Sequence, residues 1–341
     1  MDVIGTLEIL WKGLKGRYGT IGAYSAAQRG FATFAALAFG GSMLVDAPFG
    51  RYLHTSTFPK IFTVSGRVGW MLMEIVSPLS FLYFLSAPPS ISPSSFPAPS
   101  LTRLLSTLSN LPRARQLLAA LYVTHYANRS IVSELRNPGR SPMHVVIPIL
   151  SALFNLVNGG TIGMYVAGGL GGANSTGSGL KPHSALLFGG GIALWLAGFV
   201  SNLWHDEVLL DIKRKKQAQP RQDKAGKPEE RYDIPQGGLY RYLSHPSYTS
   251  EWLEWTGFTL ATFALSLAPF PPSDSLLAAA GVPSLLRPLQ QWYLQPPALF
   301  VLQEVAAMLP RALSGHRWYK ETFGKDWEKK GARWAVIPGI C

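Results

Sequence analysis

Long apolar stretches alternate with short polar ones along most of this chain. Seven windows approach the roughly 20 mainly apolar residues that a membrane-spanning helix needs, and Pro-, Ser-, Gly- or charge-rich loops separate them. The windows are residues 27–46, 68–87, 114–134, 144–168, 184–210, 251–270 and 292–311. The pattern predicts an all-α integral membrane protein, a bundle of seven transmembrane helices. In the fifth window, small residues at 189, 193, 197 and 201 predict a close approach of a neighbouring helix.

Composition strengthens the membrane interpretation. Of the 341 residues, 47% are hydrophobic and only 15% are charged, whereas an average soluble domain has about 25% charged residues. The net charge is +12, but the basic residues lie in short stretches between apolar windows, so we expect the lipid bilayer and not nucleic acid as the partner. Cys341 is the single cysteine and the histidines are scattered, which predicts neither a disulfide framework nor a metal site. No obligate protein partner is indicated.

The loop charges predict an orientation. Most Lys and Arg residues fall in one set of loops and in the tail after residue 311, and the intervening loops hold few of them. The basic loops are residues 47–67, 135–143 and 211–247, and the neutral loops are residues 88–113, 169–183 and 271–291. Because basic loops face the cytosol, a multi-pass protein with a cytosolic C-terminus is expected. Residues 1–26 are interpreted as an interfacial helix or a lead-in, and residues 27–341 as one membrane domain.

Several polar residues lie inside or at the ends of the apolar windows. A charge at the centre of a spanning helix costs about 2.5–3.5 kcal/mol on insertion scales, so such residues are functional candidates, although hydrogen bonds between helices would also explain them. Glu74 is mid-window, and Glu251 and Glu254 stand at the mouth of the sixth window, where we expect them to face a polar ligand. The other candidates are Tyr126, Arg129, Asn202, Asp206, Lys213, Ser247, Arg311 and Tyr319. With the excess of Arg and Lys, they suit a phosphate-bearing ligand held between helices from the cytosol.

Five segments of the chain resemble the steroid 5α-reductase family, in a fungal- or plant-like form. The C-terminal half contains YDIPQGGLYRYLSHPSYTSEWLEWTGFTLAT and PRALSGHRWYKETF, and the upstream segments are GRVGWMLMEIVSP, THYANRSIVSELRNPGR and SNLWHDEVLLDIK. The resemblance runs from about residue 49 to residue 340 in the same order. The chain departs from the family's pattern at Ser247, where Asn is usual, at Gly315, where some members continue a histidine run, and in an insertion at 271–291.

The resemblance implies a seven-helix enzyme of the endoplasmic reticulum membrane. Such an enzyme takes hydride from NADPH and reduces a double bond conjugated to a ketone, most typically the Δ4 bond of a 3-oxo steroid or a related sterol or terpenoid. Glu74 and Tyr126 match the pair that polarises the substrate carbonyl, and Trp70, one helical turn from Glu74, is expected to wall the flat substrate. The matching cofactor contacts, mostly in residues 184–341, are Arg129, Asn137, Arg140, Asn202, Asp206, Lys213, Tyr232, Ser247, Glu251, Arg311, His316 and Tyr319.

The expected chemistry places hydrogen-bond donors at the ketone. Hydride addition at the β-carbon leaves an enolate, which a phenolic Tyr126 and a neutral Glu74 would stabilise in a water-poor site. Three alternatives stay open: an enoyl-thioester reductase of very-long-chain enoyl-CoA, an isoprenylcysteine-type membrane methyltransferase, and a non-enzymatic scaffold or transporter. The Trp70 and Glu74 segment favours steroid-like substrates, and the charges of Arg140 and Lys213 favour NADPH, whose cytosol-facing site would lie between the helices.

Overall fold

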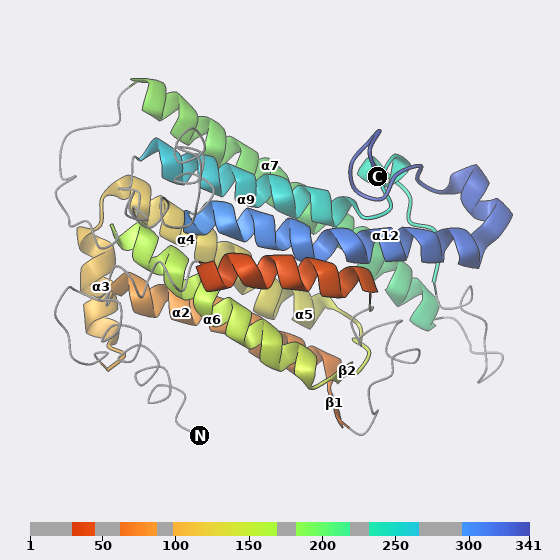
Figure 1. Ribbon diagram of the computed structural model, residues 1–341, viewed down its shortest axis with the longest axis horizontal. Helices are drawn as coiled ribbons and strands as arrows, with labels where there is room; N and C mark the ends of the chain where they lie inside the picture. Colours follow the sequence, from red (N-terminus) through yellow and green to blue (C-terminus); the bar gives the residue numbers. More distant parts are fainter. Residues whose placement is uncertain (1–28, 45–61, 87–97, 169–181, 219–231, 266–294) are drawn as a thin grey trace.

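Each of the seven predicted windows contains a helix in the computed structural model (Figure 1). The structure describes residues 29–44, 62–86, 98–168, 182–218, 232–265 and 295–341, so the segment 1–26 and the insertion at 271–291 lie outside the described residues. After a helix at residues 29–44, the elements are β1 (Thr63–Val64), α2 (Gly66–Ser86), α3 (Leu101–Asn110), α4 (Arg113–Ala127), a π-helix (Asn128–Val132), α5 (Ser133–Arg136), β2 (Met143–His144), α6 (Val146–Ala167), α7 (Pro182–Ala218), a 3₁₀-helix (Gly238–Arg241), α9 (Pro246–Ala264) and α12 (Pro296–Lys330).

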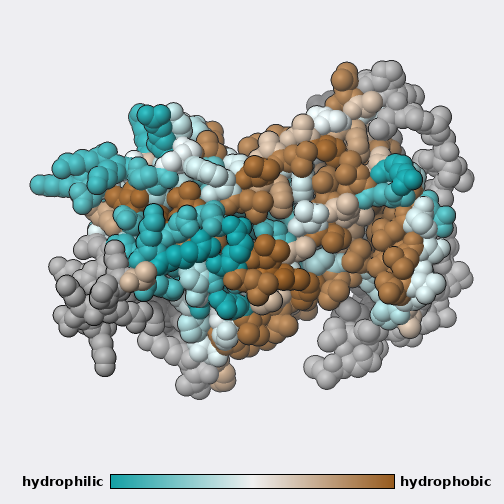
Figure 2. All heavy atoms as spheres, turned by 180° about the vertical axis from the view of Figure 1, so that it is seen from behind, coloured by the Kyte–Doolittle hydropathy of each residue, from teal (hydrophilic) through white to brown (hydrophobic). Residues whose placement is uncertain are grey.

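Three of the described helices are long and apolar enough to cross a membrane by length and composition alone. They are Gly66–Ser86, Val146–Ala167 and Ser184–Ala218. Hydrophobic side chains cover much of one face of the molecule, and hydrophilic side chains gather toward the end where α7 and α12 finish (Figure 2). These features are those of a membrane protein. The count of seven spans and their orientation stay predictions.

Three features differ from the expected all-helical bundle with plain loops. Helix α3 lies within the predicted loop at 88–113, where Ser100 caps it by accepting a hydrogen bond from the Arg103 backbone N–H. The two short strands pair antiparallel, with Thr63 opposite His144, and join the start of α2 to the start of α6. Helices α7 and α12 both extend well beyond their apolar windows, because basic and polar residues continue the helical chain after the apolar run ends.

The helices pack most closely in two pairs, α2 with α6 and α7 with α9. A Cβ atom on Gly163 would collide with the Phe81 carbonyl oxygen, and one on Gly198 would collide with the backbone N of Glu254. Of the predicted small-residue stripe at 189, 193, 197 and 201, only Ser201 meets α9, where its hydroxyl lies 2.8 Å from that of Ser250. The prediction is wrong for the other three residues, which are exposed. The spacing of small residues defines a face of the helix, but it does not show which face meets a neighbouring helix. In α7, the face that meets α9 contains Gly191 and Gly198.

Helices α4 and α12 complete the core between these pairs. In Figure 1, α9 lies between α7 and α12, and the helix at 29–44 crosses the bundle near α12 and α6. The Phe81 and Tyr122 rings stack 4.2 Å apart, and Trp255 meets Phe300 edge-on at 4.6 Å. All four side chains are almost fully buried. This aromatic core fixes the helices that carry the polar side chains described next.

Candidate active site

A cavity of about 600 Å³ lies among the helices, and its wall includes residues from the helix at 29–44 and from α2, α4, α6, α7, α9 and α12. All of the predicted site residues line it except Tyr232, His316 and Tyr319. One part of the wall is aromatic: the Phe154 ring lies 6.2 Å from those of both Phe34 and Phe300. The rest of the wall combines aliphatic side chains with charged and amide side chains. A cavity of this size with apolar walls and a few convergent polar groups is typical of a small-molecule site.

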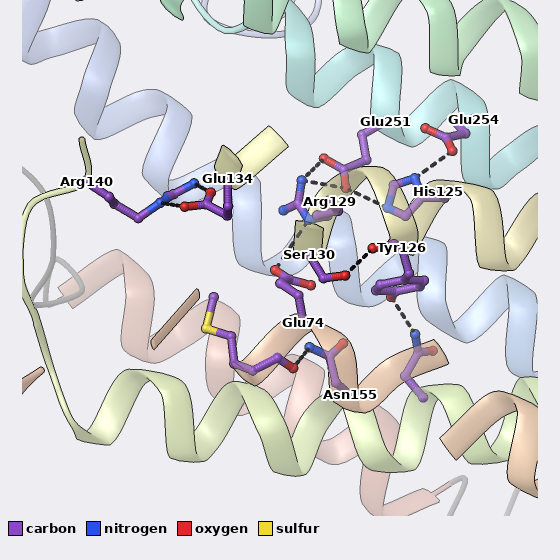
Figure 3. Close-up of polar contacts among 12 residues, drawn as sticks. Glu74, His125, Tyr126, Arg129, Ser130, Glu134, Arg140, Asn155, Glu251 and Glu254 are labelled. Atoms are coloured by element: carbon purple, nitrogen blue, oxygen red, sulfur yellow. Dashed lines mark hydrogen bonds and ion pairs between the residues drawn. The ribbon is translucent and has the colours of Figure 1, made fainter. Parts of the chain in front are cut away.

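Arg129 lies at the centre of the polar part. Its Nη1 is 3.1 Å from one carboxylate oxygen of Glu251 and 3.2 Å from the other, and its Nε is 3.4 Å from Glu74 Oε1 (Figure 3). Arg129 belongs to the π-helix, whose wider turn follows α4 directly, and such single turns recur at functional sites. Ser130 donates to the Tyr126 carbonyl oxygen over 2.6 Å within this turn. The widened turn thus holds Arg129 between two carboxylates from α2 and α9.

This arrangement alters the interpretation of Glu74. The sequence analysis expects a neutral Glu74 that donates to a ketone, whereas the structure places a guanidinium 3.4 Å from its carboxyl oxygen. Glu74 and Arg129 therefore form an ion pair, a role that the sequence analysis does not predict for Glu74. Glu74 also faces the cavity, so its side chain is placed to meet a ligand.

Glu254 does not face the cavity, contrary to expectation. It is fully buried behind the wall, where its Oε1 lies 2.7 Å from His125 Nδ1. His125 lines the cavity, and its Nε2 lies 3.7 Å from Glu251 Oε1. The carboxylates at 251 and 254 therefore have different environments: one borders the cavity beside Arg129, and the other contacts it only through a histidine ring.

Tyr126 presents its hydroxyl beside a small network of buried polar side chains. Asn158 Nδ2 is 3.3 Å from the Tyr126 hydroxyl oxygen and 3.4 Å from that of Tyr122. Ser77 and Tyr122 share a further hydrogen bond of 2.7 Å. Because the Asn158 amide N–H donates, the Tyr126 oxygen acts as the acceptor in this contact, and its own proton is available to another acceptor. Tyr126 lines the cavity and Tyr122 does not.

Cationic side chains gather around Trp70. The guanidinium of Arg140 lies 3.9 Å from the centre of the Trp70 ring, and that of Arg129 lies 5.4 Å away. Glu134, itself buried, accepts from Arg140 Nε over 3.0 Å. Trp70 Nε1 is buried and has no hydrogen-bond partner among the described residues. Trp70 therefore stands in the charged part of the cavity and not in a purely apolar wall, and its contact with a substrate stays a prediction.

Helix α7 adds two further polar contacts to this wall. Lys213 Nζ donates to Asn137 Oδ1 over 2.9 Å, and Ser247 Oγ donates to Asp206 Oδ1 over 2.7 Å. Position 247, where the family usually has Asn, thus has a serine whose hydroxyl hydrogen-bonds directly to the Asp206 carboxylate of α7. Asn202 and Arg311 line the same cavity.

Glu304 is a cavity residue that the sequence analysis does not predict. It lies on α12 and carries the same signal as Glu74: an acidic residue inside an apolar window with no basic residue nearby in that window. Glu304 adds a further carboxylate to those of Glu74, Asp206, Glu207 and Glu251 around the cavity.

Tyr232, His316 and Tyr319 lie outside the cavity, in an aromatic cluster around the C-terminal half of α12. Tyr319 stacks on Trp327 with ring centres 4.9 Å apart, and Tyr232 meets Trp318 edge-on at 5.0 Å. His316 Nδ1 is 2.9 Å from Ser244 Oγ. Burial and the nearby charge of Lys320 lower the pKa of His316 to about 4. For these three residues, contact with a cofactor stays a prediction.

Sequence comparisons show which known proteins this chain resembles. The sequence profile described as 3-oxo-5-alpha-steroid 4-dehydrogenase matches residues 141–271. A protein of Schizosaccharomyces pombe described as uncharacterized is 34% identical over 311 residues, which cover 88% of this chain and 93% of that protein. The rat (Rattus norvegicus) 3-oxo-5-alpha-steroid 4-dehydrogenase 1 is 29% identical over 312 residues, covering 91% and 92% of the two chains. Steroid 5-alpha-reductase DET2 of Solanum lycopersicum is 27% identical over 304 residues, covering 86% and 87%.

The fold and the cavity define a helical membrane protein with a polar site for a small molecule. The relatives identify the family within this broad class. The rat and tomato relatives are named as a steroid dehydrogenase and a steroid reductase. The chain belongs to the steroid 5-alpha-reductase family, in which the S. pombe protein is a fungal relative.

Proposed function

We propose that this protein reduces the carbon–carbon double bond of a conjugated ketone, with the Δ4 bond of a 3-oxo steroid or of a related sterol or terpenoid as the substrate. The observation that carries the proposal is the Tyr126 hydroxyl, which lines the cavity and accepts a hydrogen bond from Asn158 over 3.3 Å. Because Asn158 donates in that contact, it does not occupy the phenolic proton, and we infer that this proton turns to a substrate oxygen when one is bound. The relatives' names support a 3-oxo steroid over an enoyl thioester or a methyl-group acceptor.

The polar part of the cavity suits NADPH as the reductant. Its cationic side chains, Arg140, Lys213 and Arg311, match the negative charges of phosphate groups. Trp70 Nε1, which is buried and has no hydrogen-bond partner in the part of the chain that the structure describes, is a donor that a polar ligand would satisfy. When bound, the nicotinamide supplies the hydride. The side chains proposed to hold the cofactor in the cavity are Arg129, Asn137, Arg140, Asn202, Asp206, Lys213, Ser247, Glu251 and Arg311.

The protein's own contribution is to hold the ketone and stabilise the charge that develops on it. Reduction at the β-carbon makes the ketone oxygen an enolate oxygen, and the Tyr126 hydroxyl donates to that oxygen from a preorganised position. Such a donor acts most strongly where water is excluded, as beside the Phe34, Phe154 and Phe300 rings. Glu74 is the proposed second donor, and its contact with Arg129 gives it a competing role as an ion-pair partner.

The proposed setting is the endoplasmic reticulum membrane. A chain with seven spans and a cytosolic C-terminus would open the basic part of the cavity to cytosolic NADPH, while an apolar substrate arrives from the bilayer. The basic loops at 135–143 and 211–247 support this orientation.

The experiment uses the purified protein in nanodiscs. NADPH oxidation is followed with a 3-oxo-Δ4 steroid and, in parallel, with a very-long-chain enoyl-CoA, and binding of NADPH, NADH and S-adenosylmethionine is titrated. Steroid-dependent NADPH oxidation with a saturated 3-oxo product is the expected result. Reduction of enoyl-CoA alone, or binding of S-adenosylmethionine in place of NADPH, would contradict the proposal.

A further inference from the structure

His125 and Glu254 form a buried acid–base pair whose function the mechanism above leaves unassigned. Glu254 Oε1 lies 2.7 Å from His125 Nδ1, and both side chains are almost completely buried (Figure 3). His125 lines the cavity beside Tyr126, and Glu254 lies behind it on α9. The pair therefore connects the interior of the bundle with the cavity through a single imidazole ring.

The charges around the pair indicate that it holds an additional proton. Arg129 contacts Glu74 and Glu251, and among the described residues no Arg or Lys forms an ion pair with Glu254. The second carboxyl oxygen of Glu254 is buried without a hydrogen-bond partner among the described residues. A buried ionised carboxylate with an unsatisfied oxygen is strongly disfavoured, whereas a protonated carboxyl donating to a histidine nitrogen is not. The short contact between Nδ1 and Oε1 fits such a protonated pair.

The packing around Glu254 separates it from water on the side away from the cavity. Trp255 meets the His125 ring edge-on at 4.7 Å, and Gly198 brings the α7 backbone directly against the backbone of Glu254. Nε2 of His125 points the other way, toward Glu251 at 3.7 Å and the cavity. A proton held by Glu254 thus leaves most directly through the histidine ring.

The proposed reduction needs a proton of this kind. Hydride addition at the β-carbon moves the electron pair of the double bond onto the α-carbon and the ketone oxygen, and the α-carbon must then gain a proton. Tyr126 is assigned to the oxygen, and its phenol would become a costly buried phenolate if it gave its own proton away. The group that protonates the carbon is therefore a different one.

We propose that Glu254 and His125 are the proton reserve of this reaction, an inference that rests on the proposed function. The Nε2 proton of His125 passes to the α-carbon, the Glu254 proton passes to Nδ1 along the 2.7 Å contact, and Glu254 is left as a carboxylate. The imidazole is neutral before and after, with its proton moved from one nitrogen to the other. Water reaching the cavity after product release restores the proton to the pair.

Infrared spectroscopy of the resting protein tests the reserve without substrate or cofactor. The carbonyl stretch of a protonated carboxylic acid should appear in the wild-type spectrum and disappear in Glu254→Gln, since an amide keeps the shape and the contact with His125 but has no acidic proton. Glu321→Gln, at an exposed position on α12, is the matched control and should retain the band. Identical wild-type and Glu254→Gln spectra in the acid region would overturn the proposal.

Single turnovers with a 3-oxo-Δ4 steroid test the role in the reaction. Loss of a general acid typically slows a reaction about a hundredfold or more, so Glu254→Gln should be slowed to that degree. The proton step should then limit the rate: the solvent deuterium isotope effect should grow, and the effect of deuterated NADPH should shrink. A lower rate with both isotope effects unchanged would mean that Glu254 only positions His125, and the proposal would be wrong.

Two further results keep the test decisive. If Glu254→Gln does not fold, Glu254→Asp takes its place in both tests. This variant retains an acid, so it should keep an acid band, and its reduction rate should lie between that of the wild type and zero. A wild-type protein that shows the acid band assigned to Glu254 but does not reduce any 3-oxo-Δ4 steroid would refute the proposed function and leave the protonated pair intact. A wild type that reduces the steroid but lacks the band would refute the reserve alone.

Discussion

The side-chain amide of Asn158 donates to the hydroxyl oxygen of Tyr126 over 3.3 Å, from α6 to α4. An acceptor held in this way orients the phenolic proton, so Tyr126→Phe should remove an oxyanion donor while preserving the packing of the ring. Loss of one such donor typically costs about a hundredfold to a thousandfold in rate. The measurement is NADPH oxidation with a 3-oxo-Δ4 steroid under single-turnover conditions, and NADPH affinity should change little.

Tyr122→Phe is the matched control for this variant. The Tyr122 hydroxyl bonds to Ser77 over 2.7 Å, and the side chain is buried outside the cavity. Loss of this hydroxyl should lower the free energy of unfolding by about 1 kcal/mol, the typical net contribution of one hydrogen bond. The reduction rate should stay nearly unchanged. Equal rates for wild type and Tyr126→Phe would remove Tyr126 from the reaction.

Cofactor choice gives a second prediction. The 2′-phosphate of NADPH adds up to about two negative charges, and Arg140 and Lys213 are the cavity cations proposed to pair with it. NADPH should be preferred over NADH, and Arg140→Ala and Lys213→Ala should each reduce that preference about tenfold. Binding of both cofactors is measured by titration. Lys215→Ala, two residues along α7 at an exposed position, should keep the preference, and an equal loss in all three variants would argue against a specific phosphate contact.

The sequence locates the helices because long apolar runs leave few alternatives, and the structure has a helix in each predicted window. It does not determine their contacts. Residues 189, 193 and 197 of the predicted small-residue face of α7 are exposed, and the close backbone contact with α9 uses Gly191 and Gly198. Three-dimensional packing decides which of two small-residue faces meets the neighbour, and no pattern within one helix contains that information.

The site shows the same limit. Arg129, Glu74 and Glu251 stand out as charges in apolar windows, and they do line one cavity. The π-helix at Asn128–Val132, which places Arg129 between the two carboxylates, has no clear sequence signal. Glu254 carries the same sequence signal as Glu251 but lies behind the cavity wall. Three residues along a helix turn the side chain by about 60°, and at the edge of a cavity that rotation decides between lining the cavity and lying behind its wall.

The lowered pKa of His316 predicts a pH dependence of stability. The folded protein keeps this histidine neutral to a pKa of about 4, against the ordinary value of 6.5. The unfolded chain therefore binds the proton more readily, and stability should fall as the pH drops from 6.5 toward 4, by at most about 1.4 kcal/mol per pH unit. Thermal midpoints measured across this range should fall more steeply for the wild type than for His316→Gln. Lys320→Gln should also flatten the curve, because it removes one cause of the shift, and parallel curves for all three proteins would show that His316 does not contribute.

Membrane topology gives a fourth prediction. If the basic loops are cytosolic, epitope tags at position 222 and at the C-terminus should be accessible in cells whose plasma membrane alone is permeabilised. A tag at position 175, in a neutral loop, should become accessible only when internal membranes are also opened. A protected C-terminus would rule out the seven-span orientation.

The last prediction separates two roles of Glu74, which lies 3.4 Å from Arg129 Nε and also faces the cavity. If its side chain donates to the ketone, Glu74→Gln should retain much of the single-turnover rate, because an amide donates without needing a proton, whereas Glu74→Ala should lose about a hundredfold. Arg129 keeps its contact with Glu251 in both variants, so NADPH affinity should stay similar. If Glu74 serves only as the charged partner of Arg129, the Glu74→Gln and Glu74→Ala variants should be equally slow.

The double variant tests whether Tyr126 and Glu74 donate to the same oxygen. If they do, the rate loss of the combined Tyr126→Phe and Glu74→Ala variant should be smaller than the sum of the two single losses, expressed as free energies. Fully additive losses would contradict a shared oxygen.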